Sequence, residues 1–310
     1  MNKYYFVLAA FLIGLQSQAQ TTTATVPATT EQTSTTKVES AAAAVASPFS
    51  VSIFMLGGYN DQQFYNERPS FTVMDSYIAL NYNVTKDIRV SARPAFGYTT
   101  SGLSSARGNR APEEVSDKAS IRDFSFAGSI RNIMSDTLQD SLALKFKPRL
   151  FLATSDRSKD EGMIARLRLE WELKYYTSKT SDLRIILKPN YYFQKDTAVS
   201  STDSRGRVSF RGTRLADAEN YVEFTQDIGE SKTFAIKPVI GQDDEWSNKS
   251  AANGINDTFR KSRLFYGAGF EISPTRDLQA TLGVRTYKDV YQPANSEETS
   301  YTLMVDAQVF

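Results

Sequence analysis

Apolar and polar residues alternate along nearly the whole chain beyond Pro48, which is the pattern of β-strands whose two faces meet different surroundings. The clearest run spans residues 163–175, where apolar side chains take one face. Charged side chains take the other face: Arg166, Arg168, Glu170, Glu172 and Lys174. A strand of this length, with one face suited to lipid and one to water, is typical of a tilted strand in a membrane barrel.

Repeats of this pattern predict about twelve antiparallel strands. Their apolar sets fall within residues 49–55, 74–82, 88–98, 124–130, 142–152, 163–175, 183–193, 222–228, 234–240, 264–272, 278–284 and 301–309. The eighth run is the weakest, so that counts of ten or fourteen strands stay open. In lipid the sheet must close, because an open edge would leave backbone N–H and C=O groups without partners.

The connections between these strands alternate in length. Short turns are expected near residues 85–87, 135–140, 177–182, 229–231 and 273–277. Longer polar loops are expected at 60–69, 99–119, 154–161, 196–216, 242–258 and 292–298. This alternation is typical of an all-β, transmembrane, antiparallel up-and-down barrel of the outer membrane, with its short turns in the periplasm and its long loops outside the cell.

The first residues predict export. Lys3 precedes an apolar run over residues 4–15, and the small-x-small triplet Ser17-Gln18-Ala19 follows. We interpret residues 1–19 as a secretory signal peptide. Residues 20–47 are rich in Thr and Ala and carry no aromatic side chain, which predicts a disordered periplasmic linker. The barrel is expected over residues 48–310, in the cell outer membrane.

Composition and charge narrow the function. The 36 Lys and Arg residues against 35 Asp and Glu give a net charge of +1, which argues against a nucleic-acid partner. The chain has no cysteine and no histidine, so it offers neither a thiolate nor the commonest general base. We expect no enzymatic activity, no cofactor and no metal. The run Asp243-Asp244-Glu245 is placed in a long loop, where acidic residues are usually solvated, although they can hold Ca²⁺.

Charged residues in the polar phase of the strands are the candidate functional set, because that phase would face the lumen. Four strands carry a cation followed by proline, at Arg93-Pro94, Lys147-Pro148, Lys188-Pro189 and Lys237-Pro238, and a proline inside a strand tends to mark a bulge or bend. The predicted pore-lining and selectivity residues are Arg89, Arg93, Lys145, Lys147, Arg149, Arg166, Arg168, Glu170, Glu172, Arg184, Lys188, Glu219, Glu223, Lys237, Arg263 and Arg285. Cations outnumber acids in this set, which favours anions.

The signal peptide, the alternating strands and the terminal Phe310 together resemble the outer-membrane β-barrels of Gram-negative bacteria. In size the chain is similar to the small twelve-stranded monomeric porins for oligogalacturonate and sialic acid. The resemblance implies a monomer in contact with outer-membrane lipid and lipopolysaccharide. It also implies that Phe310 is part of the signal read by the barrel-assembly machinery, although Val309 and the apolar residues before it alternate out of phase with Phe310.

These observations predict a porin, that is, a passive channel for small hydrophilic and preferably anionic solutes. Two alternatives stay open. In the first, the inward charges pair across strands and fill the lumen, and a non-conducting barrel acts in adhesion or recognition through its external loops. In the second, the barrel transports hydrophobic solutes, for which the only hint is a set of apolar residues in the inward phase: Phe54, Leu56, Phe71 and Val73.

Overall fold

The computed structural model describes residues 47–60, 70–103, 114–131, 133, 141–202, 208–229, 232–248, 258–275, 277–291 and 297–309. The predicted signal peptide, residues 20–46 of the predicted linker and Phe310 lie outside the described residues.

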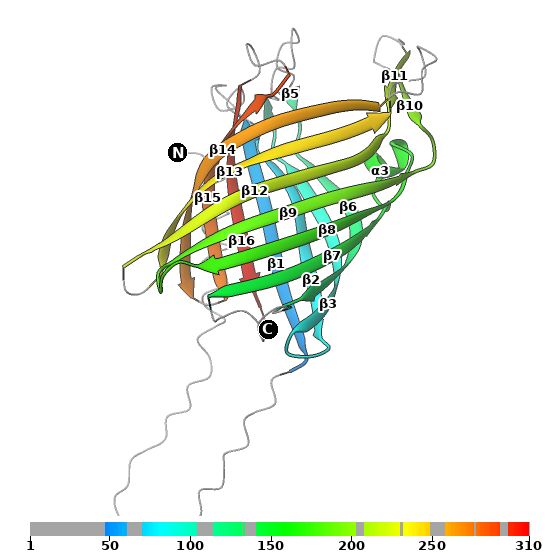
Figure 1. Cartoon of the computed structure of the whole chain (residues 1–310). Helices are drawn as coiled ribbons and strands as arrows, with labels where there is room; N and C mark the ends of the chain where they lie inside the picture. Colours follow the sequence, from blue (N-terminus) through cyan, green and yellow to red (C-terminus); the bar gives the residue numbers. More distant parts are fainter. Residues whose placement is uncertain are drawn as a thin grey trace, which may run out of the picture. The chain divides into compact units, whose positions relative to one another are not determined.

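Twelve antiparallel strands close into one barrel. They are β1 (Phe49–Asn60), β2 (Thr72–Asn83), β3 (Ile88–Thr99), β6 (Lys118–Ile130), β7 (Leu142–Leu152), β8 (Met163–Tyr176), β9 (Ser181–Gln194), β12 (Arg214–Ile228), β13 (Phe234–Asn248), β14 (Thr258–Thr275), β15 (Leu278–Asp289) and β16 (Glu298–Gln308). Each pairs with its neighbours in chain order, and β1 pairs with β16 to close the ring (Figure 1). The predicted fold class and the count of twelve are confirmed, including the weakest run, which is β12.

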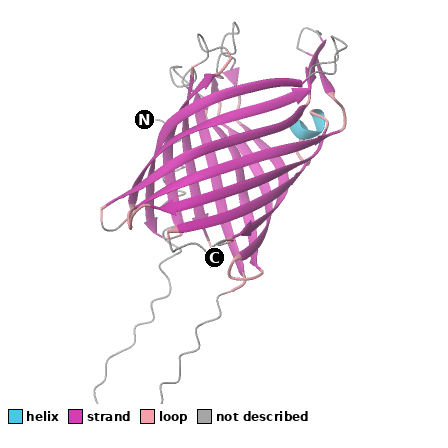
Figure 2. Cartoon of the chain, viewed as in Figure 1, coloured by secondary structure: helices cyan, strands magenta, loops and turns pink. Residues whose placement is uncertain are grey.

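The two ends of the barrel differ, as the alternation of short and long connections predicts. Short turns join β2 to β3 and β8 to β9. The other end carries the extra elements: the hairpins β4 (Gly102–Leu103) with β5 (Glu114–Val115) and β10 (Ala198–Thr202) with β11 (Val208–Gly212), and the helix α3 (Asp156–Asp160). Figure 2 shows the tilted strands and α3 at the end that bears the longer connections.

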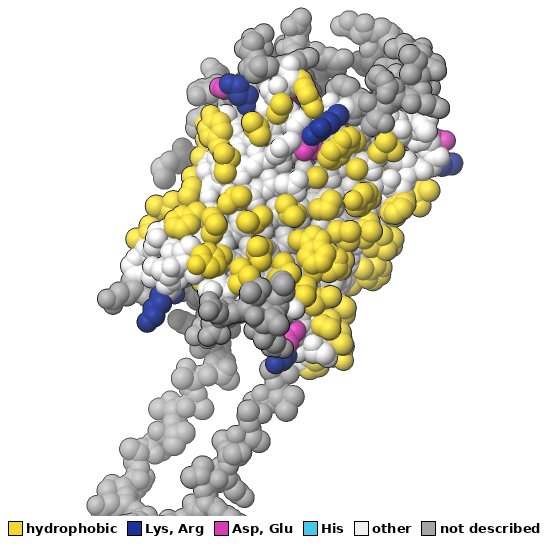
Figure 3. All heavy atoms as spheres, viewed as in Figure 1, with side chains coloured by type: hydrophobic (Ala, Val, Ile, Leu, Met, Phe, Trp, Pro, Cys, Tyr) yellow, Lys and Arg dark blue, Asp and Glu magenta, His cyan; other side chains and the backbone are white. Residues whose placement is uncertain are grey.

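The barrel is apolar outside and polar inside. Large apolar side chains such as Leu80, Ile240 and Leu282 are 53%, 63% and 56% exposed on the outer face. Figure 3 shows a broad band of apolar side chains on the outer face, with the visible charged side chains toward the ends of the strands. Ser125 and Phe265, in the opposite phase, are fully buried. Among the described residues, none of the helices has the length and apolar character needed to cross a membrane.

Several predicted loops are partly strand, including 99–119, which contains β4 and β5. Residues 242–248, expected in a loop, continue β13 to Asn248 and pair with β14 in an unbroken ladder. Within the predicted loop 196–216, residues 198–202 and 208–212 form the β10–β11 hairpin. Polar composition misled the prediction, because strands that extend past the lipid boundary have two polar faces and lose the alternation.

The prolines act differently from one another. At Pro94 the register between β3 and β6 shifts, as expected for a bulge. At Pro148 the register is kept, but the β6–β7 ladder skips from the pair Ala127–Arg149 to the pair Ile130–Phe146. Equivalent gaps occur beside Pro189, between β8 and β9, and beside Pro238, between β12 and β13. A proline has no N–H to donate, so these strands lose ladder bonds on one side without changing register.

Phe71 and Val73 face outward, whereas the sequence predicted that they face inward. The Phe71 ring packs against the Tyr59 ring, with their centroids 6.0 Å apart. It also covers Gly57, where an added Cβ would lie 2.3 Å from Phe71 Cζ. Gly57 and Tyr59 belong to the outward phase of β1, together with Val73, the strand partner of Gly57. A one-residue register shift between Val73 and Ser76 reverses the phase at this end of β2. The inward apolar set is therefore reduced to Phe54 and Leu56.

Candidate permeation pathway

The predicted pore-lining residues all lie on barrel strands, in the phase opposite to the exposed apolar side chains. On β8, for example, Trp171 and Tyr175 are exposed outside, whereas Arg168 and Glu170 occupy the alternate positions. By strand, the set is distributed as follows: Arg89 and Arg93 on β3; Lys145, Lys147 and Arg149 on β7; Arg166, Arg168, Glu170 and Glu172 on β8; Arg184 and Lys188 on β9; Glu219 and Glu223 on β12; Lys237 on β13; Arg263 on β14; Arg285 on β15.

The lysines of the cation–proline phrases pair with carboxylates on the next strand. Lys147 Nζ lies 2.9 Å from Glu170 Oε1 and 2.7 Å from Glu172 Oε2. Lys145 also binds Glu172, at 3.1 Å. Lys237 is hydrogen bonded to Glu271 on β14. This part of the wall has the cross-strand pairing that the non-conducting alternative expects, and its charges are locally balanced.

A second balanced cluster links β9, β12 and β15. Lys188 Nζ lies 3.0 Å from Tyr221 Oη and 3.5 Å from Glu219 Oε2. Arg285 reaches the same carboxylate from β15, with its Nη1 2.8 Å from Glu219 Oε1. Glu219 therefore accepts from strands on both sides of it. Nearer the short turns, Arg184 contacts Asp182 at 2.8 Å and Glu223 at 3.6 Å.

The acidic run of β13 is fully engaged by arginines. Asp243 pairs with Arg263 at 2.5 Å, and Glu245 pairs with Arg214 at 2.7 Å. Asp244, on the opposite face of the strand, pairs with Arg260 at 3.0 Å. Consecutive residues of a strand point to opposite faces, so these carboxylates cannot converge on one ion. The described residues contain no group of His, Cys, Asp and Glu side chains that could hold a metal ion.

Four arginines are held in a different way, and we call Arg93, Arg149, Arg166 and Arg168 the arginine group. The Cζ atoms of Arg149, Arg166 and Arg168 lie 4.3, 3.7 and 5.3 Å from the centre of the Phe151 ring. Those of Arg149 and Arg93 lie 4.7 and 4.8 Å from the centre of the Tyr77 ring. Aromatic faces attract cations, so two rings hold the group along the wall from β3 to β8.

Neutral oxygens accept hydrogen bonds from three members of the arginine group, Arg93, Arg166 and Arg168. Arg93 Nε donates to Ser91 Oγ at 3.0 Å, and Arg168 Nε donates to Asn190 Oδ1 at 2.9 Å. Arg166 Nη1 lies 3.5 Å from Tyr192 Oη. Within the described part of the chain, no carboxylate forms an ion pair with Arg93, Arg166 or Arg168. Arg89, lower on β3, likewise donates to a neutral oxygen, Asn83 Oδ1, at 2.9 Å.

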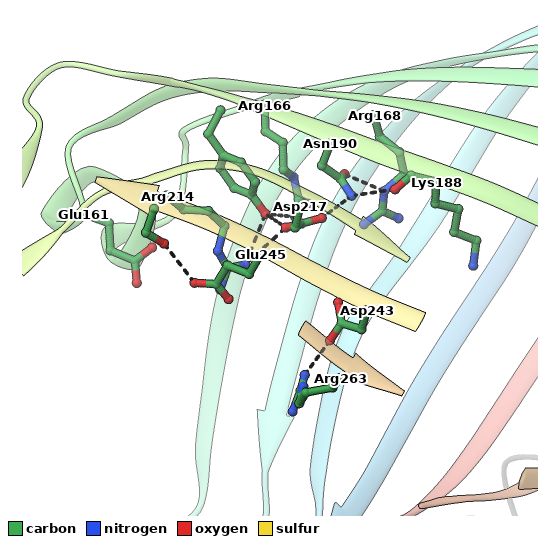
Figure 4. A network of polar contacts seen from close by, with 12 residues as sticks. Glu161, Arg166, Arg168, Lys188, Asn190, Arg214, Asp217, Asp243, Glu245 and Arg263 are labelled. Carbon is green, nitrogen blue, oxygen red and sulfur yellow. Dashed lines mark hydrogen bonds and ion pairs between the residues drawn. The ribbon is translucent and has the colours of Figure 1, made fainter. Parts of the chain in front are cut away.

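A polar network joins the arginine group to the paired wall (Figure 4). Asn190, which accepts from Arg168, donates to Asp217 Oδ1 at 2.5 Å, and Tyr192 Oη donates to Asp217 Oδ2 at 2.6 Å. Arg214 then contacts the same carboxylate at 3.3 Å. Uncharged Asn190 and Tyr192 thus lie between the guanidinium groups of Arg166 and Arg168 and the carboxylate of Asp217.

The predicted pore-lining set contains only charged residues, so it does not include the aromatic and amide side chains that hold the arginine group. Tyr77, Phe151, Asn190 and Tyr192 lie in the polar phase of predicted strands, whereas Asp217 lies next to the predicted loop 196–216. Phe151 and Tyr192 each interrupt the polar phase of a strand whose apolar phase is already complete. Their contact with particular arginines depends on the pairing of β7 with β8 and of β8 with β9.

No protein-family model matches the chain, and a search of curated protein sequences finds no match either. Solved structures do match in fold. An outer membrane channel from Pseudomonas putida F1 superposes with a TM-score of 0.54 at 10% identity, covering 84% of this chain and 95% of that one. The NanC porin gives a TM-score of 0.44 at 11% identity, covering 82% and 98% of the two chains. The KdgM porin in complex with disordered oligogalacturonate gives 0.41 at 7% identity, covering 83% and 98%. The closed barrel of twelve strands, together with the match to the Pseudomonas putida channel, shows that this chain has the fold of an outer-membrane β-barrel.

Proposed function

We propose that this protein is a monomeric outer-membrane channel through which small hydrophilic solutes, preferably anions, diffuse passively. The observation that carries the proposal is the arginine group, in which Arg93, Arg166 and Arg168 are held by aromatic rings and neutral oxygens on the inner wall. A positive wall without bound carboxylates attracts anions and repels cations.

The inner wall carries both lysines paired with carboxylates and arginines held by rings and neutral oxygens, and this difference is the physical basis of the anion preference. Lysines on β7, β9 and β13 contribute little net field, because each is paired with a carboxylate of an adjacent strand. The arginines of β3 and β8 keep their charge, and their hydrogen bonds and ring contacts fix where it lies. A passing anion would replace water at donors that are already positioned.

Orientation and assembly follow from the same proposal. The short-turn end would face the periplasm and the end with β10, β11 and α3 the exterior, as in other barrels of this class. The outer apolar band would contact lipid and lipopolysaccharide. Phe310 would contribute to recognition by the barrel-assembly machinery, and residues 1–19 would direct export before removal.

Ion selectivity in planar bilayers tests the proposal. In a KCl gradient, the full-length mature chain is expected to give discrete conductance steps. The reversal potential is expected to have the sign of a pore that passes Cl⁻ more readily than K⁺. Arg168→Gln is expected to shift that potential toward zero. The matched control is Arg157→Gln on α3, an arginine whose side chain is 71% exposed outside the barrel wall. Equal shifts in the two variants would refute the role of the arginine group.

The same recording separates the alternatives. A filled barrel that acts only through its external connections would insert without conductance steps. A transporter of hydrophobic solutes would need an apolar path, and the outward position of Phe71 and Val73 reduces the predicted apolar set of the first two strands to Phe54 and Leu56. Absence of steps from protein that is folded and inserted would overturn the channel proposal.

A further inference from the structure

Four inward side chains stand on four consecutive strands at one level of the wall. Asp306 on β16 is the strand partner of Phe54 on β1, and Phe54 is the strand partner of Tyr77 on β2. The Phe54 and Tyr77 rings are stacked, with centroids 5.0 Å apart. Arg93 reaches from β3 to place its Cζ 4.8 Å from the centre of the Tyr77 ring. Two aromatic rings therefore stand between a carboxylate and a guanidinium.

The Asp306 carboxylate is available to a ligand. It is exposed, and its strand partners, Phe54 on β1 and Gln279 on β15, are both uncharged. Within the described residues it takes part in neither a hydrogen bond nor an ion pair. Asp217, at the other end of the arginine group, differs in that it is engaged by an amide, a phenol and Arg214.

Arg93 also has unused donors. A guanidinium carries five N–H groups. Its Nε donates to Ser91 Oγ at 3.0 Å and its Nη1 to Tyr77 Oη at 3.4 Å. These two contacts orient the group over the Tyr77 ring and leave N–H groups that a carboxylate can accept from in the two-point geometry typical of arginine.

We propose that Asp306 and Arg93 form a two-point binding site for zwitterionic solutes. Asp306 binds the ammonium group, Arg93 binds the carboxylate, and the apolar body of the solute lies against the edges of Phe54 and Tyr77. The inference rests on the proposed channel function and narrows its solute class from anions in general to carboxylates that also carry an amine.

The spacing selects among zwitterions. Neighbouring strands lie roughly 4.8 Å apart, so the two strand steps from Asp306 to a guanidinium held over β2 are about 10 Å. A solute must therefore carry its amine and carboxylate several bonds apart, as ω-amino acids and short peptides do. Glycine, whose amine and carboxylate are attached to the same carbon atom, cannot reach both groups.

Equilibrium binding to the purified mature chain in detergent tests the site, with radiolabelled 6-aminohexanoate as the probe. Asp306→Asn is expected to weaken its binding about tenfold, the effect of a lost hydrogen bond between charged groups. Binding of hexanoate, which lacks the amine, is expected to stay unchanged in that variant and to weaken in Arg93→Gln. The matched control is Asp160→Asn, the same change at an exposed carboxylate on α3.

The outcomes distinguish this inference from the channel proposal. Equal affinity of the wild type and Asp306→Asn for 6-aminohexanoate overturns the zwitterion site, and so does equal affinity of the wild type for 6-aminohexanoate and hexanoate. Conductance steps recorded from the same preparation decide the channel proposal separately. A folded protein that binds 6-aminohexanoate through Asp306 but does not conduct would support the site and refute the channel.

Discussion

The Cζ atom of Arg166 lies 3.7 Å from the centre of the Phe151 ring, the shortest arginine–ring distance among the described residues. Phe151 is only 4% exposed, because Arg149 and Arg168 also lie against it. One aromatic side chain thus brings together three cations whose mutual repulsion would otherwise spread them apart. This contact makes Phe151 the point at which the arginine group is best tested.

Replacing Phe151 by Leu keeps an apolar side chain of similar size and removes the ring. Each lost cation–π contact costs about 0.5–1 kcal/mol where water has access, so we expect a loss of roughly 1–3 kcal/mol in the free energy of unfolding. Urea unfolding in lipid vesicles, followed by tryptophan fluorescence, measures it. Phe151→Tyr keeps the ring and serves as the control. Equal stability of Phe151→Leu and the wild type would show that the ring does not hold the arginines.

Removing Lys147 tests the paired wall. Lys147→Met removes the cation that Glu170 and Glu172 share, while Lys145 still contacts Glu172. The Lys147 side chain is 37% exposed, so we expect a loss of about 1–3 kcal/mol, below the cost for a fully buried pair. Urea unfolding of Lys147→Met and of the triple variant Lys147→Met, Glu170→Gln and Glu172→Gln measures it. Recovery of stability in the triple variant is expected. No recovery would mean that lost packing, and not unpaired charge, destabilises the single variant.

The contact between Gly128 and Pro148 explains how β6 accommodates a proline in its neighbour. A Cβ on Gly128 would lie 3.2 Å from Pro148 Cγ, closer than ordinary contact. We expect Gly128→Val to destabilise the barrel by about 1–3 kcal/mol through overpacking. Gel electrophoresis of samples heated to increasing temperatures measures the loss, because the folded band of the variant is expected to disappear at a lower temperature than that of the wild type. Adding Pro148→Ala should restore most of the loss, and additive effects of the two changes would contradict the proposed contact.

Asp123 on β6 forms hydrogen bonds with the connection between β7 and β8. Its carboxylate accepts from Ser155 N at 3.0 Å, from Ser155 Oγ at 2.8 Å and from Ser158 Oγ at 2.5 Å. Asp123→Ala removes all of these bonds at the start of α3, so we expect faster tryptic cleavage after Arg157, whose side chain is 71% exposed. Limited proteolysis with mass spectrometry measures the rate. Asp160→Ala, on the same helix, is the control. An unchanged rate in Asp123→Ala would show that the loop is held by other contacts.

The sequence alone could predict the strands, their number and the inward set, because a strand alternates its side chains with a strict period of two. In a strand with this period, such as Met163–Tyr176, the sequence of the strand alone shows which side chains share a face, whichever strands it pairs with. The same reasoning failed where the period is broken. The register shift beside Val73 moved Phe71 to the outer face, and the polar extension of β13 had no apolar phase to read.

Only the tertiary structure decided which charges are neutralised. Arg285 and Glu219 are 66 residues apart, and Lys237 and Glu271 are 34 apart, so their pairing depends on how separate strands align. The same alignment brings Phe151 under the arginines and places Asp306 beside Phe54. A one-residue slip would exchange every partner while leaving each strand's composition unchanged. The sequence of a single strand therefore determines which side chains share a face, whereas the pairing of charges depends on how the strands align.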